Sequence, residues 1–414
     1  MRLAVELYGT VIGHIHGPDA RSFDVEITDE ARETFGVNSR VMSVAIPLLA
    51  SMPRQHGGRR RNWFAELLPE GDQLDYMLTQ GGVRRGDIPA FLARYGRDVA
   101  GALQIWDVDD PSEPRTPGVI PIDAEGIRRL LEDPIGAPLG NATDYGRTSL
   151  GGVQPKIVLA RTGARWNQAL GGFPSTHILK PQLPTRPTVI FDEEYGARLS
   201  RRLGLAAFDT RVEEFDGLPT LVIERFDRAG GARIHQEDFN QVLGASANQK
   251  YQELGGVVSL ARVAGALSQY AGSEDVLRLA QTTILAVGIG NLDMHTKNLG
   301  LLHPAHDVPA LAPAYDQVPL AHASGGDGRL ALAVNRKYRH AEITRDDLVS
   351  EFESWQLRRA AAAVSDALDE LSAAVAEEVP LDSAHPELHD SMSSFVRNLR
   401  EGRAVGDGRA PSAG

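Results

Sequence analysis

The chain has 414 residues, a net charge of −12 at pH 7 and no cysteine. The missing cysteines exclude disulfide bonds, thiolate zinc sites and cysteine nucleophiles, and the acidic balance argues against a broad nucleic-acid-binding surface. This length suits two or three packed domains rather than one small core. The start lacks the apolar run of a signal peptide, and no stretch of about eighteen uninterrupted apolar residues occurs, so we expect a cytoplasmic protein without a membrane span.

The first part of the chain is expected to be a small domain that contains a sheet. Alternating or continuous apolar residues between Gly- and Pro-rich turns predict strands in three segments: residues 3–7, 23–27 and 41–47. Helical spacing of apolar residues follows in 63–92. Four prolines and several acids in 107–121 indicate a connector, so we place the first domain boundary there.

A second region, from about residue 147 to 227, has the pattern of an α+β unit. Short apolar runs suit sheet strands in residues 157–160, 177–180 and 218–223. Between the last two runs, Tyr195, Leu199 and Leu203 recur every four residues, as on one face of a helix.

The remainder of the chain is mainly helical in pattern. Residues 275–289 are strongly apolar over a helical length, and 348–379 are Ala-rich and amphipathic. Residues 402–414 are rich in Gly, Ala and Pro, so we expect a disordered tail. A sheet-rich lobe followed by a larger helical lobe is the order found in kinases.

Three oxygen-bearing side chains in the helical region have the spacing that phosphoryl transfer requires. That reaction needs a carboxylate to take a hydroxyl proton and oxygen ligands to hold Mg²⁺ against the ATP phosphates. Asp293 and Asn298 have the D-x-x-x-x-N spacing of a kinase catalytic loop, and Asp316 follows. We predict Asp293 as general base and the other two as Mg²⁺ ligands. In the alternative, Asn291 and Asp293 form only a cap and turn after a helix that ends at Ile289.

Lysine is scarce in this chain. The 43 basic residues include five lysines: Lys156, Lys180, Lys250, Lys297 and Lys337. Such lysines should be enriched where a guanidinium cannot replace a slim ammonium. Lys180 ends an apolar strand, so we predict that it grips the ATP phosphates, with Glu193 or Glu194 as its partner. In the alternative, Lys180 is an edge-strand lysine that only discourages aggregation. Glu193 and Glu194 would then lie at a solvated helix start, near the favourable end of the helix dipole. Lys297 could neutralise the transferring phosphoryl group, and His295 could brace the loop.

Two further segments could contact the nucleotide. Ser149–Lys156 combines small residues with a lysine, so its backbone N–H groups could approach phosphate oxygens; it could equally be a hairpin turn. Glu224–Arg228 follows an apolar strand, where a kinase hinge would meet adenine and Phe226 could pack on the ring. An ordinary strand-end charge cluster explains that segment as well. The basic run 53–61 could contact nucleic acid or an acidic partner, but we favour a solvated loop.

The ordered set of motifs resembles the HipA family of bacterial serine/threonine kinases, the toxin halves of toxin–antitoxin pairs. The similarity covers most of the chain and includes residues 62–69, 95–102, 149–156, 176–180, 224–228, 236–238, 293–298 and 315–316. It implies an α+β, protein-kinase-like bilobal fold with an N-terminal sheet-containing subdomain and a mainly helical C-terminal lobe. The implied divisions are the HipA N-terminal subdomain, a kinase N-lobe region, a helical kinase C-lobe and a tail: 1–108, 109–235, 236–401 and 402–414.

The resemblance also implies roles for individual residues in a kinase that uses ATP and Mg²⁺. Asp293 is the implied catalytic base, and Asn298 and Asp316 are the implied metal ligands. The residues implied to bind ATP are Gly151, Gly152, Val153, Gln154, Pro155, Lys156, Lys180, Glu224, Arg225, Phe226, His295, Thr296, Lys297, Asn298, Tyr315 and Asp316. Ser149 matches the serine that family members autophosphorylate, which ejects the loop and switches the kinase off. A dianionic phosphate beside an ATP-binding loop would repel the nucleotide.

The resemblance implies protein partners as well. Family members phosphorylate an aminoacyl-tRNA synthetase, often the glutamyl enzyme, which halts translation and produces dormancy. A HipB-like helix-turn-helix antitoxin neutralises them, and the complex binds operator DNA through that antitoxin. Two departures bear on the transfer: Pro155 stands where the family often has Glu and stiffens the loop, and the metal site reads Tyr-Asp-Gln rather than Asp-Phe-Gly.

Two other functions remain open from the sequence. A small-molecule phosphotransferase would share the catalytic motifs, although a small acceptor gives no reason for the first domain. A catalytically silent corepressor subunit of an antitoxin–DNA complex would need none of the catalytic side chains.

Overall fold

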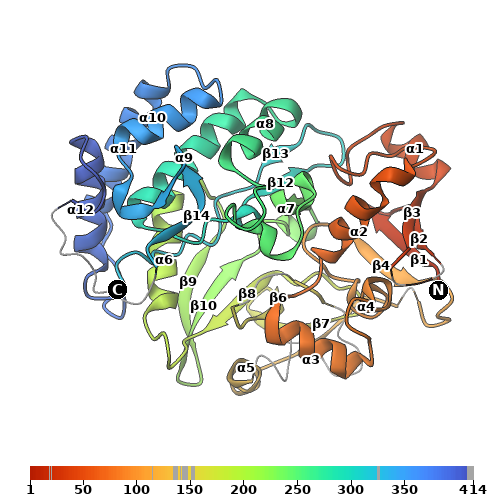
Figure 1. Cartoon of the computed structure of the whole chain (residues 1–414). Helices are drawn as coiled ribbons and strands as arrows, with labels where there is room; N and C mark the ends of the chain where they lie inside the picture. The colour runs from red at the N-terminus through yellow and green to blue at the C-terminus, as the bar shows by residue number, and fades with distance from the viewer. Residues whose placement is uncertain are drawn as a thin grey trace.

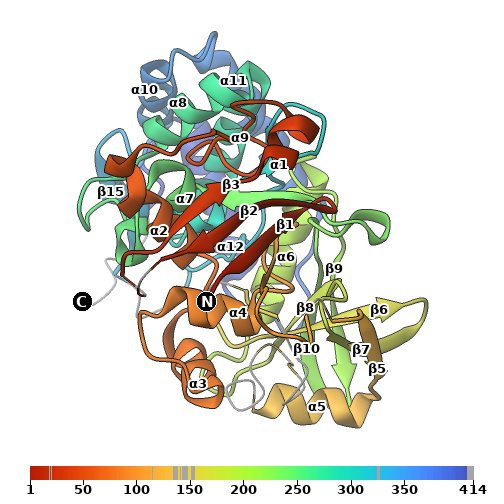
Figure 2. The same ribbon diagram turned by 90° about the vertical axis from the view of Figure 1, so that its right-hand side faces the viewer.

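The computed structural model describes residues 1–17, 19, 21–113, 115–133, 139, 141, 148–150, 154–323 and 327–407. The N-terminal part is a four-stranded antiparallel sheet with helices packed on it (Figures 1 and 2). The strand order is β3-β2-β1-β4, and the strands are β1 Leu3–Leu7, β2 Thr10–His16, β3 Asp24–Ile27 and β4 Gln104–Asp107. The helices are α1 Asp29–Phe35, α2 Gly57–Ala65, α3 Gly71–Gly81 and α4 Ile88–Tyr95. The predicted strands 3–7 and 23–27 and the helical pattern of 63–92 are confirmed.

Two predictions for the N-terminal part are wrong. Residues 41–47 pair in no sheet; the segment is apolar because Met42 and Ile46 are fully buried. The basic run is mostly exposed, as expected, but it is not a loop, since α2 begins within it. Arg60 alone is buried as an arginine of this run, against Asp24, with Nε 2.6 Å from Oδ1.

The second part is a six-stranded antiparallel sheet of order β5-β7-β6-β8-β10-β9. Its strands are β5 Gly118–Pro121, β6 Ile157–Thr162, β7 Arg165–Leu170, β8 His177–Pro181, β9 Thr210–Phe215 and β10 Leu218–Glu224. Two helices pack on it: α5 Ala124–Glu132 and α6 Val189–Arg202. Adjacent residues of β10 point to opposite faces, as strand geometry requires: Val222 joins the core beneath α5, and Leu221 joins the core that contains α6. Helix α6 therefore lies between the sheet and the third part.

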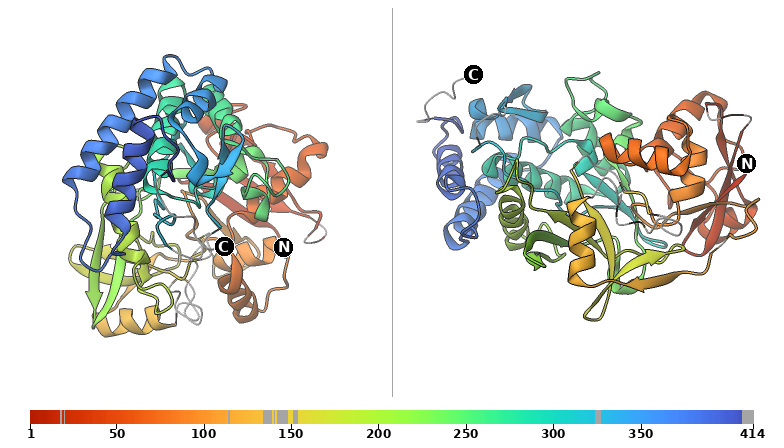
Figure 3. Two further views of the ribbon diagram at one scale, coloured as in Figure 1. Left: turned by 60° about the vertical axis from the view of Figure 1, so that its left-hand side comes forward. Right: turned by 90° about the horizontal axis from the view of Figure 1, so that it is seen from below.

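The third part is mainly helical, as predicted. Its helices are α7 Phe239–Leu243, α8 Leu260–Tyr270, α9 Ser273–Ile289, α10 Arg345–Ser354, α11 Ala360–Glu377 and α12 Leu388–Arg400. Its short strands are β11 His235–Asp238, β12 Gly300–His303, β13 Ala310–Leu311, β14 Arg329–Val334 and β15 Lys337–Arg339. Nearly all of α9 from Leu279 onward is buried, with α11 and α12 packed on it. Figures 1 and 3 show α11 and α12 in blue at the end of the molecule opposite the red N-terminal strands.

The expected disordered tail is wrong for its first residues. Val405 is fully buried, its N–H donates to the carbonyl of Ile343 at 2.9 Å, and its own carbonyl accepts from Asn398 at 3.0 Å. One apolar side chain anchors a segment whose average composition indicates disorder. Residues 408–414 lie outside the described part of the chain.

Candidate active site

A cavity of about 660 Å³ lies where the three parts of the chain meet. The N-terminal part, the six-stranded sheet and the helical part each contribute to its wall. The predicted site residues that line it are Gln154, Pro155, Lys156, Lys180, Glu224, Arg225, Phe226, Asp293, His295, Lys297, Asn298, Tyr315 and Asp316. Residues predicted from distant motifs thus share one space. Gly151, Gly152 and Val153 lie outside the described residues.

The loop that is predicted to be catalytic begins where α9 ends. Gly290 closes the helix in the left-handed conformation at φ 74°, where glycine carries no steric penalty. The side chain of Asn291 then accepts the N–H of Asp293 at 3.0 Å, and Asn298 Nδ2 donates to the carbonyl of Asp293 at 3.0 Å. The cap-and-turn alternative is therefore correct as a description of the backbone, and that turn is what presents Asp293 to the cavity.

Asp293 has the environment of a general base. Its side chain is 47% exposed, and the hydroxyl of Tyr251 donates to Oδ1 at 3.2 Å. Loss of solvent, followed by the negative charge of Asp316, raises the pKa of Asp293 to about 6. Burial, followed by the positive charge of Lys250, lowers the pKa of His295 to about 4. His295 is thus neutral near pH 7, and the carboxylate beside it is ionised.

Lys180 joins two carboxylates from different elements. Its Nζ lies 2.7 Å from Glu193 Oε1 on α6 and 2.8 Å from Asp316 Oδ1. Of the two predicted partners, Glu193 is the one that pairs, because Glu194 binds Arg198 one helical turn away. Burial alone would raise the pKa of Asp316, but Lys180 more than offsets this and lowers it to about 2.

A glycine on α6 permits the close approach of the segment that carries Asp316. A Cβ added to Gly196 would lie 1.9 Å from the carbonyl oxygen of Gln317. Asp316 itself has φ 55°, in the left-handed region that a side chain rarely adopts. The backbone is therefore held in a strained conformation that directs the carboxylate toward Lys180.

The donor atoms of this region suit Mg²⁺. Because Asn298 donates its Nδ2 to a carbonyl, its Oδ1 is the atom left to accept or to coordinate. Asp316 bonds Lys180 through Oδ1, and its side chain is 32% exposed. One amide oxygen and one ionised carboxylate are hard ligands of the kind that Mg²⁺ takes beside nucleotide phosphates.

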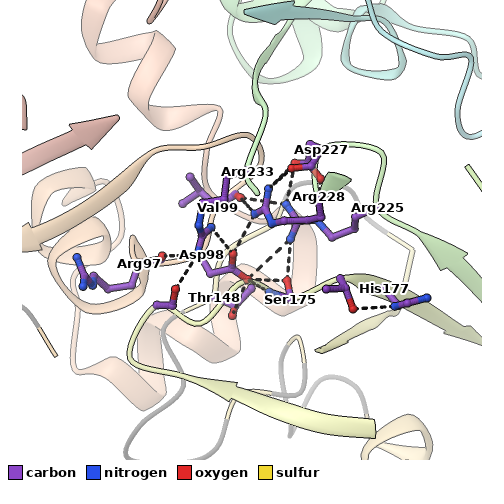
Figure 4. A network of polar contacts seen from close by, with 12 residues as sticks. Arg97, Asp98, Val99, Thr148, Ser175, His177, Arg225, Asp227, Arg228 and Arg233 are labelled. Atoms are coloured by element: carbon purple, nitrogen blue, oxygen red, sulfur yellow. Dashed lines mark hydrogen bonds and ion pairs between the residues drawn. The ribbon is translucent and has the colours of Figure 1, made fainter. Parts of the chain in front are cut away.

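The residues after β10 fit both interpretations of segment Glu224–Arg228, the adenine-binding hinge and the strand-end charge cluster. Phe226 lies in the wall, 5.4 Å from the ring of Tyr315 between centroids, where a planar base could pack. Arg225, in contrast, turns its side chain away into a buried network with Asp227 and Asp98, which Figure 4 shows. Only the backbone of Arg225 is then left to meet adenine, as the hinge interpretation expects, and that contact stays a prediction. Glu224 is exposed and bonds the N–H of Asp209 through its carboxylate.

Three further predicted residues have other environments than expected. Thr296 is fully buried, and its hydroxyl donates to Asn240 Oδ1 at 2.6 Å, so it fastens the loop to α7 rather than facing the cavity. Ser149 is also buried, and its hydroxyl donates to the carbonyl of Leu67 at 2.8 Å. Lys297 lies in the cavity wall between Glu66 and Glu70, at 2.8 and 2.7 Å, so its predicted role toward a phosphoryl group stays a prediction.

Sequence reasoning missed several residues of the cavity wall. Lys250 and Tyr251 are two of them, and the N-terminal Glu66 and Glu70 are two more. The scarcity of lysine pointed to Lys250 without giving it a role. Lys156, which was predicted, is buried in the same wall, and burial followed by the charge of Lys180 lowers its pKa to about 8.

These features define the class of the protein. A strand lysine, its helix glutamate, the Asp and Asn of the loop after α9 and a further Asp occupy one cavity between a sheet lobe and a helical lobe, which is the arrangement of residue types found in protein kinases. The fold is the α+β, protein-kinase-like bilobal fold that the sequence predicts, with an additional N-terminal subdomain.

Comparisons with known proteins identify the family. The HipA N-terminal domain matches residues 3–106, and the HipA-like C-terminal domain matches residues 148–380. A Sinorhizobium fredii protein named as a kinase, Y4mE, is 33% identical over 321 residues, which cover 73% of this chain and 75% of that protein. The serine/threonine-protein kinase toxin HipA of Shewanella oneidensis is 29% identical over 336 residues, which cover 75% of this chain and 76% of its own. The chain belongs to the HipA family of serine/threonine kinase toxins.

The fold has a counterpart among solved structures. HipA of Shewanella oneidensis MR-1, in a complex with HipB and its operator DNA, superposes with a TM-score of 0.78 at 24% identity, over 96% of this chain and 99% of that one. Within the described residues, none of the helices combines the length and apolar character needed to cross a membrane.

Proposed function

We propose that this chain is an ATP- and Mg²⁺-dependent serine/threonine protein kinase that acts as the toxin of a toxin–antitoxin pair. The observation that carries the proposal is the contact of Lys180 with both Glu193 and Asp316, in a cavity that Asp293 and Asn298 also line. Phosphoryl transfer needs a cationic side chain that binds phosphate, two oxygen ligands for Mg²⁺ and a base for the acceptor hydroxyl.

The residues divide the reaction between them. Asp293 accepts the proton of the acceptor hydroxyl as that oxygen bonds to the γ-phosphorus, the bond to the β–γ bridging oxygen breaks, and ADP leaves. With its pKa raised to about 6, this carboxylate is ionised at pH 7 yet basic enough to take the proton. Lys180 and Lys156 hold phosphate oxygens, and Asn298 and Asp316 would hold Mg²⁺, which neutralises charge on the phosphates when bound.

Ser149 is proposed as an inhibitory autophosphorylation site. Its hydroxyl is buried against Leu67, and its N–H donates to the carbonyl of Asp98 at 3.0 Å. A phosphate on this buried hydroxyl would lie against the carbonyl oxygen of Leu67, which would repel it. Modification therefore requires the segment to leave its present place, and the dianion would prevent its return.

The partners are proposed from the family. The Shewanella oneidensis relative is named a serine/threonine-protein kinase toxin, and the solved HipA assembles with HipB and operator DNA. We extend this to a HipB-like helix-turn-helix antitoxin and to operator DNA bound mainly through it. The proposed protein substrate is an aminoacyl-tRNA synthetase, such as the glutamyl enzyme, whose phosphorylation would arrest translation.

The test begins with purified protein, Mg²⁺ and ATP labelled at the γ-phosphate. We expect label on the protein at Ser149, loss of labelling in Asp293→Asn, and retention in Asp346→Asn, which removes an exposed carboxylate on α10. Labelling that survives Asp293→Asn would remove that residue from its role. Transfer to metabolites but to no protein would support a small-molecule phosphotransferase, and failure of the wild type to bind Mg²⁺-ATP would support a silent corepressor.

The substrate requires a cellular experiment. Phosphopeptide mass spectrometry after expression of Ser149→Ala should find a phosphorylated synthetase and a growth arrest stronger than that of the wild type. Relief of the arrest by Ser149→Ala would contradict the inhibitory assignment.

A further inference from the structure

Four charged residues join the N-terminal subdomain to the catalytic loop. Glu66 follows α2 and Glu70 precedes α3, whereas Lys250 and Lys297 belong to the helical lobe. Lys297 Nζ lies 2.8 Å from Glu66 Oε2 and 2.7 Å from Glu70 Oε1, and Lys250 Nζ lies 2.9 Å from Glu70 Oε2. We call these four residues the subdomain bridge.

The subdomain bridge is buried and balanced in charge. The side chains of Lys297, Glu66 and Lys250 are 9%, 5% and 6% exposed, and that of Glu70 is 25% exposed. Glu66 also accepts hydrogen bonds from Asn240 and from the N–H of Ala247. Loss of Lys297 would leave Glu66, and loss of Glu70 would leave Lys250, without its ion-pair partner, which is strongly unfavourable for a buried charge. The four residues therefore hold one another in place.

Each lysine of the bridge immediately precedes a residue that donates a hydrogen bond to Asp293, one to its backbone carbonyl and one to its carboxylate. Lys297 precedes Asn298, whose side chain binds the carbonyl of Asp293. Lys250 precedes Tyr251, whose hydroxyl donates to Asp293 Oδ1 at 3.2 Å. Since neighbouring residues share a peptide unit, ion pairs that anchor Lys297 and Lys250 also limit the movement of Asn298 and Tyr251, which donate hydrogen bonds to Asp293.

We infer that Glu66 and Glu70 are positioning residues of the kinase, through which the N-terminal subdomain holds Asn298, Tyr251 and hence Asp293 in the arrangement that transfers phosphate. The inference rests on the proposed function and extends it, because the N-terminal subdomain becomes part of the catalytic apparatus. The acids act on the loop that holds the base, while Lys180 and Phe226 occupy other walls of the cavity. Their loss should therefore lower turnover more than it weakens nucleotide binding.

The test is the rate of self-labelling against ATP concentration in Glu66→Gln/Glu70→Gln. Glutamine keeps the size of the side chain and removes its charge. We expect the maximal rate to fall by about tenfold to a hundredfold, the cost of a misplaced catalytic group. The half-saturating ATP concentration should change by less than about threefold, because the groups that bind ATP before the reaction are unchanged. Glu70→Gln alone is the milder variant if the double variant folds poorly.

The matched control is Ser43→Ala. It removes a hydrogen bond between the same two parts of the chain, from Ser43 Oγ to Glu237 Oε2 at 2.6 Å, but acts on β11 rather than on the catalytic loop. It should keep the wild-type maximal rate. Hydrogen exchange gives an activity-independent readout: residues 293–298 should exchange faster in the Gln variants than in the control.

The outcomes separate this inference from the function on which it rests. Wild-type protein that never labels overturns the kinase proposal and the inference with it. An active wild type whose Gln variants keep both the maximal rate and the protection of residues 293–298 overturns the inference alone. An equal loss of rate in Ser43→Ala also overturns it, because any loosening of the subdomains would then have the same effect.

Discussion

Two clusters of lysines and carboxylates line the same cavity. They differ in the summed charge of their groups and in whether a carboxylate oxygen remains without a hydrogen bond. In the first, which we call the phosphate cluster, Lys180 lies between Glu193 and Asp316. The second is the subdomain bridge, in which two lysines meet two glutamates. Both are buried and both have short ion pairs, so neither burial nor distance separates them.

The summed charge of the directly ion-paired groups does separate them. The three groups of the phosphate cluster sum to −1 when ionised, and Glu193 Oε2 is buried with no hydrogen-bond partner in the described part of the chain. The four groups of the subdomain bridge sum to zero. A cluster with excess negative charge and a spare oxygen is suited to bind a cation, whereas a neutral cluster is suited to join two subdomains.

The largest effect should come from the phosphate cluster. Asp316→Asn removes the charge on the proposed Mg²⁺ ligand but leaves Lys180 paired with Glu193. We expect the rate of phosphate transfer to fall by about a thousandfold, as when a preorganised electrostatic group is lost. Melting temperature should change little, and self-labelling assays at several Mg²⁺ concentrations would show both. Activity equal to that of Asp346→Asn would mean that Asp316 holds no metal.

The subdomain bridge should respond in stability. Lys297→Met leaves Glu66 buried without its ammonium, which should cost about 3 kcal/mol of unfolding free energy. Lys337→Met is the matched control, because that lysine is 40% exposed in its pair with Asp347 and such pairs contribute about 1 kcal/mol or less. Urea denaturation measures both. Equal losses in the two variants would show that the bridge contributes no more than a surface ion pair.

The positions of these clusters explain which parts of the site the sequence could predict. Asp293 and Asn298 are close in sequence and fixed by one turn, so their spacing, together with the companion motifs, could indicate them. Lys297 lies in the same turn, but its partner Glu66 is 231 positions away, and no local pattern indicates that contact. The sequence could therefore not show that Lys297 pairs with the N-terminal subdomain.

Similar physics separates the confirmed elements from the corrected ones. Alternation predicted the strand Leu3–Leu7 because one face of a sheet is buried. Residues 41–47 are as apolar, but they are buried by contacts with β11 instead of by pairing: His235 bonds the carbonyl of Met42, and Glu237 accepts the N–H of Val44. The sequence could not decide between Glu193 and Glu194 as the partner of Lys180. Consecutive helical residues face different neighbours, so the decision requires knowing which face of α6 is turned toward the sheet.

A smaller effect should follow from the packing that supports the phosphate cluster. In Gly196→Ala the new Cβ would overlap the carbonyl of Gln317, so Asp316 must move away from Lys180. We expect the KM for ATP to rise by about tenfold with every charged group still present. Gly265→Ala on α8 is the control, because a Cβ there meets nothing within 4 Å. Unchanged kinetics in Gly196→Ala would show that the close approach does not position the carboxylate.

The smallest effect near neutral pH concerns the base between the two clusters. Burial and Asp316 raise the pKa of Asp293 to about 6, and only the ionised form accepts a proton. On lowering the pH, kcat/KM should therefore fall to half its plateau at about pH 6 and to about a tenth at pH 5. Asp316 and Glu70, whose pKa values are lowered to about 2, stay ionised throughout.

A second carboxylate could imitate this pH dependence. Burial, which outweighs the charge of Lys297, raises the pKa of Asp238 in the same cavity to about 7. Asp238→Asn should leave the acid limb near pH 6, because the proton acceptor is unchanged. If the acid limb of the kcat/KM profile disappears in Asp238→Asn, the titrating group is Asp238. The assignment of that limb to Asp293, with a pKa raised by Asp316, is then contradicted. If the acid limb persists in Asp238→Asn, the titrating group is Asp293.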